Sequence, residues 1–213
     1  MSARFIKPLY EGEMTSVIAT VTSVSADGVS FDVNALNADG ELCAAGTAAL
    51  LASPPAAPAP DAVPRAARPS ERPDASPESL AVGTILGTLD DVFRMEPVHR
   101  EYLAQIADDL ALYQGPDAPA HSGYIIRLAN RVLHDNVRLG PWIHVSSEVQ
   151  HFALLHDGDR LTTRAIVTDL FERKGHEFVD LDVLILANET TPVMRVQHRA
   201  IYKVRRADSA VAG

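Results

Sequence analysis

A short segment around His121 has the residue types that a reactive centre needs. His121 carries an imidazole that titrates near neutrality, so it can exchange a proton or orient a carbonyl group. Gly123 follows at the start of an apolar run, and a glycine there permits close approach of a ligand to the backbone. The plainer interpretation is that His121 only precedes the helix and caps it. Both interpretations place His121 and Ser122 at a helix N-terminus.

Other reactive residue types give weaker signals. The remaining histidines of the C-terminal part are scattered over expected strands, and no pair has metal-ligand spacing backed by a third ligand, so we expect no metal. Ser146 and Ser147 lack the glycines of a nucleophile elbow, and no glycine-rich phosphate loop is present. The single cysteine, Cys43, excludes a disulfide within the chain and is typical of a reducing cytoplasm.

The bulk composition narrows the class of protein. The chain has 213 residues, of which 46% are hydrophobic and 22% charged, enough apolar material for a core without staples. A net charge of -9 disfavours a nucleic-acid partner, which needs a basic surface. No run of about 18 apolar residues and no signal-peptide pattern is present, so we expect no membrane span and a cytoplasmic location.

The elements that must position these residues fall into segments of different composition. Eight of the 14 prolines lie between residues 53 and 79, which predicts an extended, mobile linker over 53–80. The alternative is an ordered loop wrapped over a sheet. We expect strands in residues 1–52, a longer unit in 81–206 and a disordered tail in 207–213.

Alternating apolar residues predict three strands before the linker, separated by turns at Ala26-Asp27-Gly28 and Asn37-Ala38-Asp39-Gly40. The longer unit begins with two helices, one from Pro97 to about Asp108 and one from about Ser122 to Val137. Four strands follow, over residues 142–155, 161–172, 176–187 and 192–204.

The two strand-rich segments resemble each other. Tyr10-Glu11-Gly12-Glu13 parallels His156-Asp157-Gly158-Asp159, and Ala19 and Val21 match Ala165 and Val167 at the same offset. Shared turn chemistry and strand spacing over the whole segment predict a structural repeat.

A helix followed by a long antiparallel meander is the plan of the hotdog fold, an α+β fold in which a curved sheet wraps around a central helix. Ala120-His121-Ser122-Gly123 resembles the start of the hotdog helix in MaoC-like dehydratases and (R)-specific enoyl-CoA hydratases. Residues 4–12 and 142–158 resemble the strand and turn after that helix. The resemblance implies a double hotdog with an incomplete N-terminal repeat, acting on an acyl thioester.

The resemblance also implies site residues. In this family an Asp and a His orient water, and the helix N-terminus, here Ser122 and Gly123, donates N–H groups to the thioester carbonyl. Asp108 falls on the family's acid, whereas Leu110-Ala111 replaces its Asn-Pro and Tyr113 replaces its His. Tyrosine, with a pKa near 10, is a poorer base than histidine. Asn130 is a candidate for hydrogen bonding to a polar acyl group.

Three functions remain open at this point. The first is a hydratase or dehydratase with Asp108, His121 and Tyr113 as catalytic residues. The second is a thioesterase, with Asp108, Asp109 or Glu148 activating water, and the third is a non-catalytic acyl-binding or assembly subunit. We expect no separate cofactor, since CoA or an acyl carrier is part of the substrate. The incomplete repeat leaves a sheet face uncovered, which predicts a homodimer or hetero-oligomer.

Overall fold

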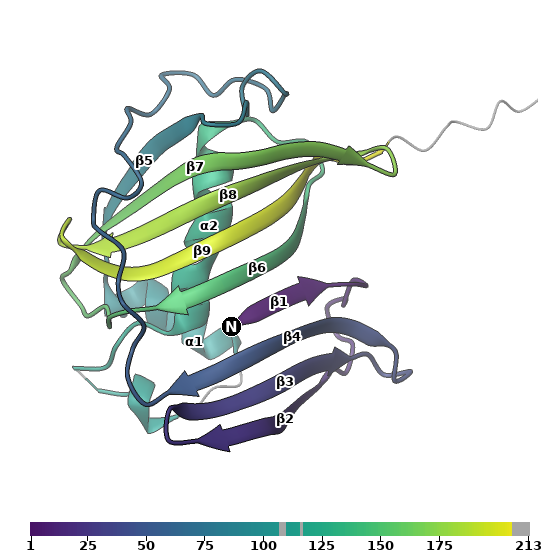
Figure 1. Ribbon diagram of the computed structural model, residues 1–213, viewed down its shortest axis with the longest axis vertical. Helices are drawn as coiled ribbons and strands as arrows, with labels where there is room; N and C mark the ends of the chain where they lie inside the picture. Colours follow the sequence, from purple (N-terminus) through teal and green to yellow (C-terminus); the bar gives the residue numbers. More distant parts are fainter. Residues whose placement is uncertain (107–109, 116, 206–213) are drawn as a thin grey trace, which may run out of the picture.

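The computed structural model describes residues 1–106, 110–115 and 117–205 of the chain. These residues form one nine-stranded antiparallel sheet in the order β2-β3-β4-β1-β6-β9-β8-β7-β5 (Figure 1). The strands are β1 (Ser2–Phe5), β2 (Ser16–Ser25), β3 (Gly28–Leu36), β4 (Leu42–Leu51), β5 (Ile85–Val92), β6 (Ile143–His151), β7 (Arg160–Arg173), β8 (His176–Ala187) and β9 (Thr191–Lys203).

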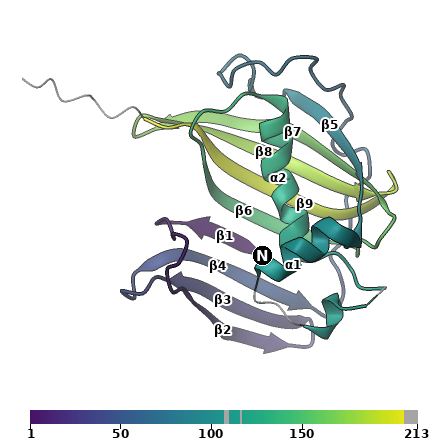
Figure 2. The same cartoon turned by 180° about the vertical axis from the view of Figure 1, so that it is seen from behind.

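The C-terminal half, β5 to β9, wraps around the helix α2 (Ser122–Asn136). Figure 2 shows α2 running across the strands of this half. The apolar residues of α2 recur at helical spacing, so one face of the helix is buried against the sheet. Leu133 and Val132 are fully buried there. This packing of a sheet around a helix, with the core between them, is the hotdog architecture predicted from the sequence.

The N-terminal half consists of β1 to β4 and joins the C-terminal half through one strand pair. β1 pairs with β4 on one side and with β6 on the other, with Ala3 opposite Ser147. The sheet is therefore continuous across a seam between β1 and β6. None of the described helices is long and apolar enough to cross a membrane.

The predicted repeat is present in the backbone geometry. Gly12 and Gly158 both have positive φ in their turns, and in each turn the acidic residue after the glycine accepts a hydrogen bond from the residue three positions earlier. The register slips between Val21 and Ser23 in one half, and between Val167 and Asp169 in the other. The same turn and the same bulge thus recur at corresponding positions.

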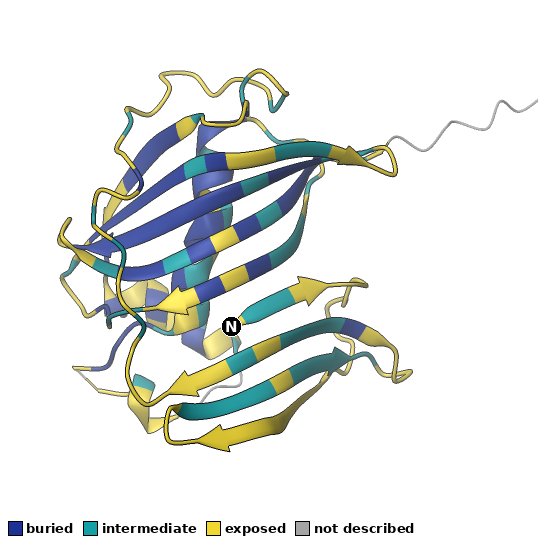
Figure 3. Cartoon of the chain, viewed as in Figure 1, coloured by how far each residue is buried: buried dark blue, intermediate teal, exposed yellow. Residues whose placement is uncertain are grey.

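Burial separates the two halves. Figure 3 shows buried residues along most of β8, in the first half of β7 and on β9 and α2, whereas β2 is exposed along its whole length. In the described residues, the N-terminal half has no counterpart of β5 beside β2 and no counterpart of α2 across its strands. It is a hotdog sheet without its helix, as the resemblance implied.

The proline-rich segment between the halves is extended but pinned to the sheet. Val63 is buried against Leu184 and Leu186 on the face opposite α2. The Arg164 side chain donates hydrogen bonds to the carbonyl groups of Pro60 and Val63. The structure thus has the loop wrapped over a sheet, the second of the two interpretations, and we correct the expectation of a mobile linker.

The other helices and strands have the predicted type, but some differ from the predicted length. All four predicted C-terminal strands and the helix from Ser122 are present. The first predicted helix is shorter, as a kinked turn η1 (Met95–His99) leads into α1 (Arg100–Gln105), and a short 3₁₀ helix η2 (Ala111–Tyr113) follows. Strand β5 was not predicted. The predicted tail, 207–213, lies outside the described residues.

Candidate functional site

The site predicted around His121 is built by the first turn of α2. His121 is the N-cap residue in an extended conformation, and its Nδ1 accepts a hydrogen bond of 2.9 Å from the Gly123 N–H. The backbone N–H groups of Tyr124 and Ile125 donate to the His121 carbonyl. His121 therefore does cap the helix, and this role fixes the direction of its ring.

A second histidine, His99, lies beneath the cap. Its Nε2 accepts a hydrogen bond of 2.8 Å from the His121 backbone N–H, and its Nδ1 lies 2.9 Å from the Met95 sulfur. His99 is fully buried among the rings of Phe93, Tyr102 and Tyr124. Burial, followed by the nearby charge of His121, lowers the pKa of His99, so the ring is neutral at pH 7.

These hydrogen bonds set the tautomers of both rings. A ring nitrogen that accepts a hydrogen bond carries no proton, so a neutral His99 is protonated on Nδ1. By the same argument, a neutral His121 is protonated on Nε2 because Nδ1 accepts from Gly123. The Nδ1 lone pair of His121 is therefore occupied by the helix, and the proton of the neutral ring is on Nε2.

Gly123 is in close contact with a side chain of the protein itself. A Cβ atom built at Gly123 would lie 2.2 Å from the Tyr102 hydroxyl oxygen. The space that a glycine opens here is therefore filled by Tyr102, and the Gly123 N–H is used by His121. The expectation that Gly123 serves close approach of a ligand is modified accordingly, since Tyr102 makes that approach in this structure.

The other predicted site residues are distributed unevenly. The Tyr113 ring lies 4.6 Å from the His121 ring, measured between centroids, so the two are brought together. Ser122 is exposed at the first position of α2. Asp108 and Asp109 lie outside the described residues. Glu148 is exposed on β6, pairing opposite Gln197 on the sheet face away from α2, so it is not part of this site.

Asn130 has an unusual environment for a polar side chain. Its Oδ1 atom is buried and has no hydrogen-bond partner among the described residues. A buried acceptor without a donor costs free energy, about 1–3 kcal/mol, so it is a natural contact for a ligand that brings a donor.

Sequence reasoning did not single out His99, Tyr102 or Tyr124 for this site. They come from the unit before α2 and from its first turn, and the aromatic cluster exists only after the chain folds back over the helix end. Arg127 stacks on the Tyr124 ring, with its Cζ 3.8 Å from the ring centroid. The signal available from sequence was the concentration of Tyr and His between residues 99 and 124.

A separate polar cluster lies at the seam. Ser147 is buried between two imidazoles, with its Oγ 2.8 Å from His144 Nε2 and 3.4 Å from His198 Nδ1. His198 Nε2 has no hydrogen-bond partner in the described part of the chain. Burial, followed by the nearby His144, lowers the pKa of His198 to about 3. Burial also lowers the pKa of His144.

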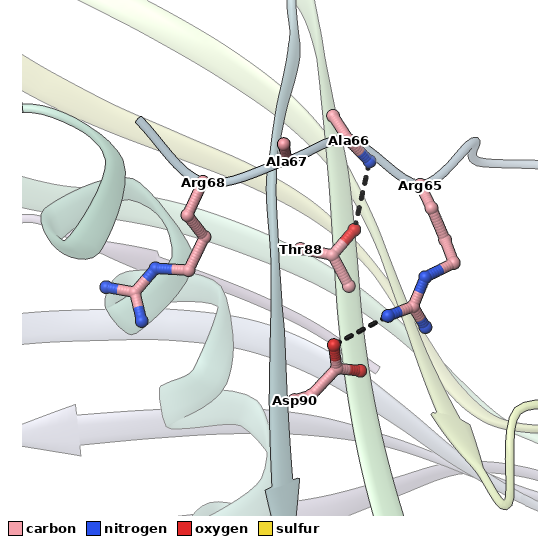
Figure 4. Close-up of a pocket in the computed structure, with 6 residues that line it drawn as sticks. All are labelled: Arg65, Ala66, Ala67, Arg68, Thr88 and Asp90. Carbon is pink, nitrogen blue, oxygen red and sulfur yellow. Dashed lines mark hydrogen bonds and ion pairs between the residues drawn. The ribbon is translucent and has the colours of Figure 1, made fainter. Parts of the chain in front are cut away.

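A surface depression of about 450 Å³ lies between the proline-rich segment and β5. Figure 4 shows its lining, where Arg65 forms an ion pair with Asp90 and the Ala66 N–H donates to Thr88. Arg68 in the same depression pairs with Asp135 in the last turn of α2, at the end opposite His121. Within the described residues, no group of three or more His, Cys, Asp or Glu could hold a metal ion.

Comparison with known proteins supports the fold through structure alone. No protein-family model and no curated protein matches the sequence. Solved structures do match. A MaoC domain dehydratase from Chloroflexus aurantiacus has a TM-score of 0.65 and 14% identity, over 96% of this chain and 74% of that chain.

Two further structures match different shares of the chain. A double hotdog protein from Mycobacterium tuberculosis has a TM-score of 0.60 and 16% identity, over 94% of this chain and 74% of that chain. An (R)-hydratase from A. caviae, involved in PHA biosynthesis, has a TM-score of 0.50 and 17% identity, over 58% of this chain and 97% of that chain. The chain therefore has a double hotdog fold similar to that of MaoC-like hydratases and dehydratases, and at these identities the likeness concerns the fold.

Proposed function

We propose that this protein binds an acyl thioester at the N-terminal end of α2 and adds water to, or removes it from, the acyl group. The observation that carries the proposal is the His121 cap. Its Nδ1 accepts a hydrogen bond from the Gly123 N–H, which fixes the imidazole at the N-terminal end of α2, beside the Tyr113 ring. The fold shared with MaoC-like hydratases and dehydratases supports the same reaction class.

The proposed hydration divides the work between two side chains. Asp108 takes a proton from water, and the water oxygen bonds to Cβ of a 2-enoyl thioester. The electron pair of the double bond moves toward the thioester carbonyl, whose oxygen gains negative charge. The His121 Nε2–H and the positive end of the α2 dipole stabilise that oxygen. The proton returns to Cα, so one water is added across the double bond, and dehydration is the reverse.

Tyr113 and Asn130 have supporting roles in the proposal. Tyr113 takes the place of the family's histidine, and its ring packs on His121, so it positions the imidazole. Asn130 presents a buried oxygen that accepts a hydrogen bond from a hydroxyl of the acyl group. Ser122 and Gly123 belong to the first turn of α2, whose dipole acts on the thioester in this proposal.

The decisive test replaces His121 without removing the cap. Asparagine is a favourable N-cap residue, so His121→Asn keeps an acceptor for the helix and removes the imidazole donor. We expect turnover of a panel of 2-enoyl-CoA thioesters to fall by roughly 100-fold, as when one oxyanion donor is lost. The assay follows the absorbance of the conjugated thioester, and His134→Asn, an exposed residue near the other end of α2, is the matched control.

Asp108→Asn tests the proposed base in the same assay, with folding checked by circular dichroism. Unchanged turnover in both variants would remove the proposed site. Release of free thiol without loss of the double bond would instead identify a thioesterase.

One observation favours the non-catalytic alternative. The Gly123, Tyr124 and Ile125 N–H groups are already used by His121, and Tyr102 lies against Gly123, so the helix end offers few donors to a thioester. Tight binding of an acyl-CoA with neither water addition nor thiol release in the wild-type protein would establish a binding subunit in place of an enzyme.

A further inference from the structure

The face of the sheet that α2 covers continues into the N-terminal half. Residues that lie opposite each other in a sheet point to the same side, and Ser147 lies opposite Ala3, which lies opposite Gly46. Ser147 shares its side with buried Val149, so this side can be followed from β6 through β1 to β4, β3 and β2. By register, every residue on that side of these three strands is Val, Ala, Phe, Leu or Gly. We call this side of the N-terminal half the bare face.

The bare face is exposed along β2 and at Leu50 and half-buried along β3, although its composition is that of a core. Val24, Leu50, Val17 and Val21 are 74%, 70%, 68% and 54% exposed. On β2 and β3 the opposite side is mostly polar, with Thr20, Ser30 and Asp32 among its residues. A strand with one apolar and one polar side is built to be covered on the apolar side. In the C-terminal half α2 provides that cover, and no described element does so here.

The size of the bare face is sufficient for a specific interface. β2 and β4 have ten residues each, about 33 Å at ~3.3 Å per residue, and three strands span roughly 14 Å at ~4.8 Å spacing. The projected area is therefore about 500 Å² per copy, or about 1,000 Å² for two such faces, before the relief of the side chains is added. Specific protein interfaces begin at roughly this total.

The charge of the bare face decides what can meet it. The chain has a net charge of -9, so two copies repel each other over most of their surface. The side of β2, β3 and β4 in question carries no charged residue, so two copies can meet there without burying an unpaired charge. An anionic membrane surface, by contrast, would attract a basic patch.

We infer that a second copy of this chain covers the bare face, with the two bare faces packed on each other about a twofold axis. Such a contact is isologous and closes on itself, so it gives a dimer that ends growth. Two sheets packed face to face place their inner side chains in one layer about 10 Å thick. Each copy thus supplies the cover that the missing helix would have given to the other.

The test measures the molecular mass of the full chain in solution. On each of β2 and β4, a substitution on the bare face is compared with a substitution of the neighbouring residue on the opposite side of the sheet. Light scattering and sedimentation equilibrium should give twice the 23.0 kDa of the chain for the wild type. Val21→Asp and Leu50→Asp bury an unpaired charge in the contact, so the dimer dissociation constant should rise by at least about 100-fold. Thr20→Asp and Ala49→Asp, the neighbours on the other side of the sheet, should leave the dimer intact.

The result is independent of turnover, so it can fail while the proposed function holds. Circular dichroism shows which variants are folded, and either face variant alone is sufficient if the other does not fold. A monomeric wild-type protein overturns the inference. The bare face would then be expected to bind a helix of another protein. A dimer that survives both face variants also overturns it, because the copies would then join elsewhere, for instance at the open edge of β2.

Discussion

The two halves of this sheet share a turn, a bulge and a strand order, yet only one of them holds a helix. In the C-terminal half, the side that faces α2 is buried and its apolar residues form one continuous core. In the N-terminal half, the same side of the same sheet has Val24 and Leu50 more than two-thirds exposed. The comparison teaches that the strand pattern of a hotdog repeat persists without its helix, while the stabilising burial does not. Three measurements can break or sharpen this comparison.

The largest difference should come from one leucine in each half. Leu133 is fully buried in α2, and Leu133→Ala removes contacts and leaves a cavity, so the free energy of unfolding should fall by about 3 kcal/mol. Leu50→Ala, on the bare face, should change it by less than about 0.5 kcal/mol in the dissociated chain. Urea unfolding at high dilution measures both. Equal losses would mean that the bare face is covered within a single chain.

A smaller effect should appear at the seam as the pH falls. The pKa of His198 is about 3 in the folded protein and near 6.5 when unfolded, so below pH 6.5 only the unfolded state gains the proton. The stability that the neutral His198 ring contributes is fully present above pH 6.5. It is lost as the pH falls toward 3, at about 1.4 kcal/mol per pH unit. His198→Asn removes this titration.

Between pH 6.5 and 4.5, the wild type should therefore lose about 2–3 kcal/mol more than His198→Asn, as measured by urea unfolding at each pH. The carboxylates and the histidines that do not contact His198 act equally in both proteins and cancel. His134→Asn, at an exposed site, is the control and should keep the wild-type slope. Parallel curves for wild type and His198→Asn would show that His198 is not buried as a neutral ring.

The smallest effect concerns the outer face, which is covered only in the C-terminal half. Val63 packs on Leu184 and Leu186. Val63→Ala removes two buried methyl groups, each contributing about 0.8 kcal/mol, so the free energy of unfolding should fall by about 1.6 kcal/mol. Val82→Ala, at a residue 61% exposed, is the control and should have little effect. No loss at Val63 would mean that the proline-rich segment is not held on the sheet in solution.

Local patterns predicted most of the fold. The alternation along β2, β3 and β8, the helical spacing of Leu128, Val132 and Leu133, and the paired glycine turns are short-range signals. The proline-rich segment was misjudged because composition reports what a segment cannot form, whereas its anchorage depends on Arg164, about a hundred positions away. Strand β5 was missed because its register with β7 is interrupted and its sequence alternates weakly.

The candidate site was predictable only in part. His121 and its cap follow from a helix start that is visible in the sequence. His99 and Tyr102 were not predictable, because they reach the helix end through tertiary packing of η1 and α1. The Asn130 Oδ1 atom, which has no hydrogen-bond partner within residues 1–106, 110–115 and 117–205, was also not predictable. A helical pattern gives the direction of a side chain from the helix axis but not the residues that bury it.

The seam between β1 and β6 also has a kinetic consequence. β2, β3 and β4 pair with their chain neighbours, as do β7, β8 and β9, so both meanders are local structures with small loops to close. The seam, in contrast, is closed by contacts such as the bond from the Met1 amino group to the Val149 carbonyl, 148 positions apart. Contacts between residues so far apart in the sequence form late, because the chain must lose the entropy of a long loop before the contact is gained. The two meanders should therefore fold first, and the β1–β6 pairing at the seam should form last.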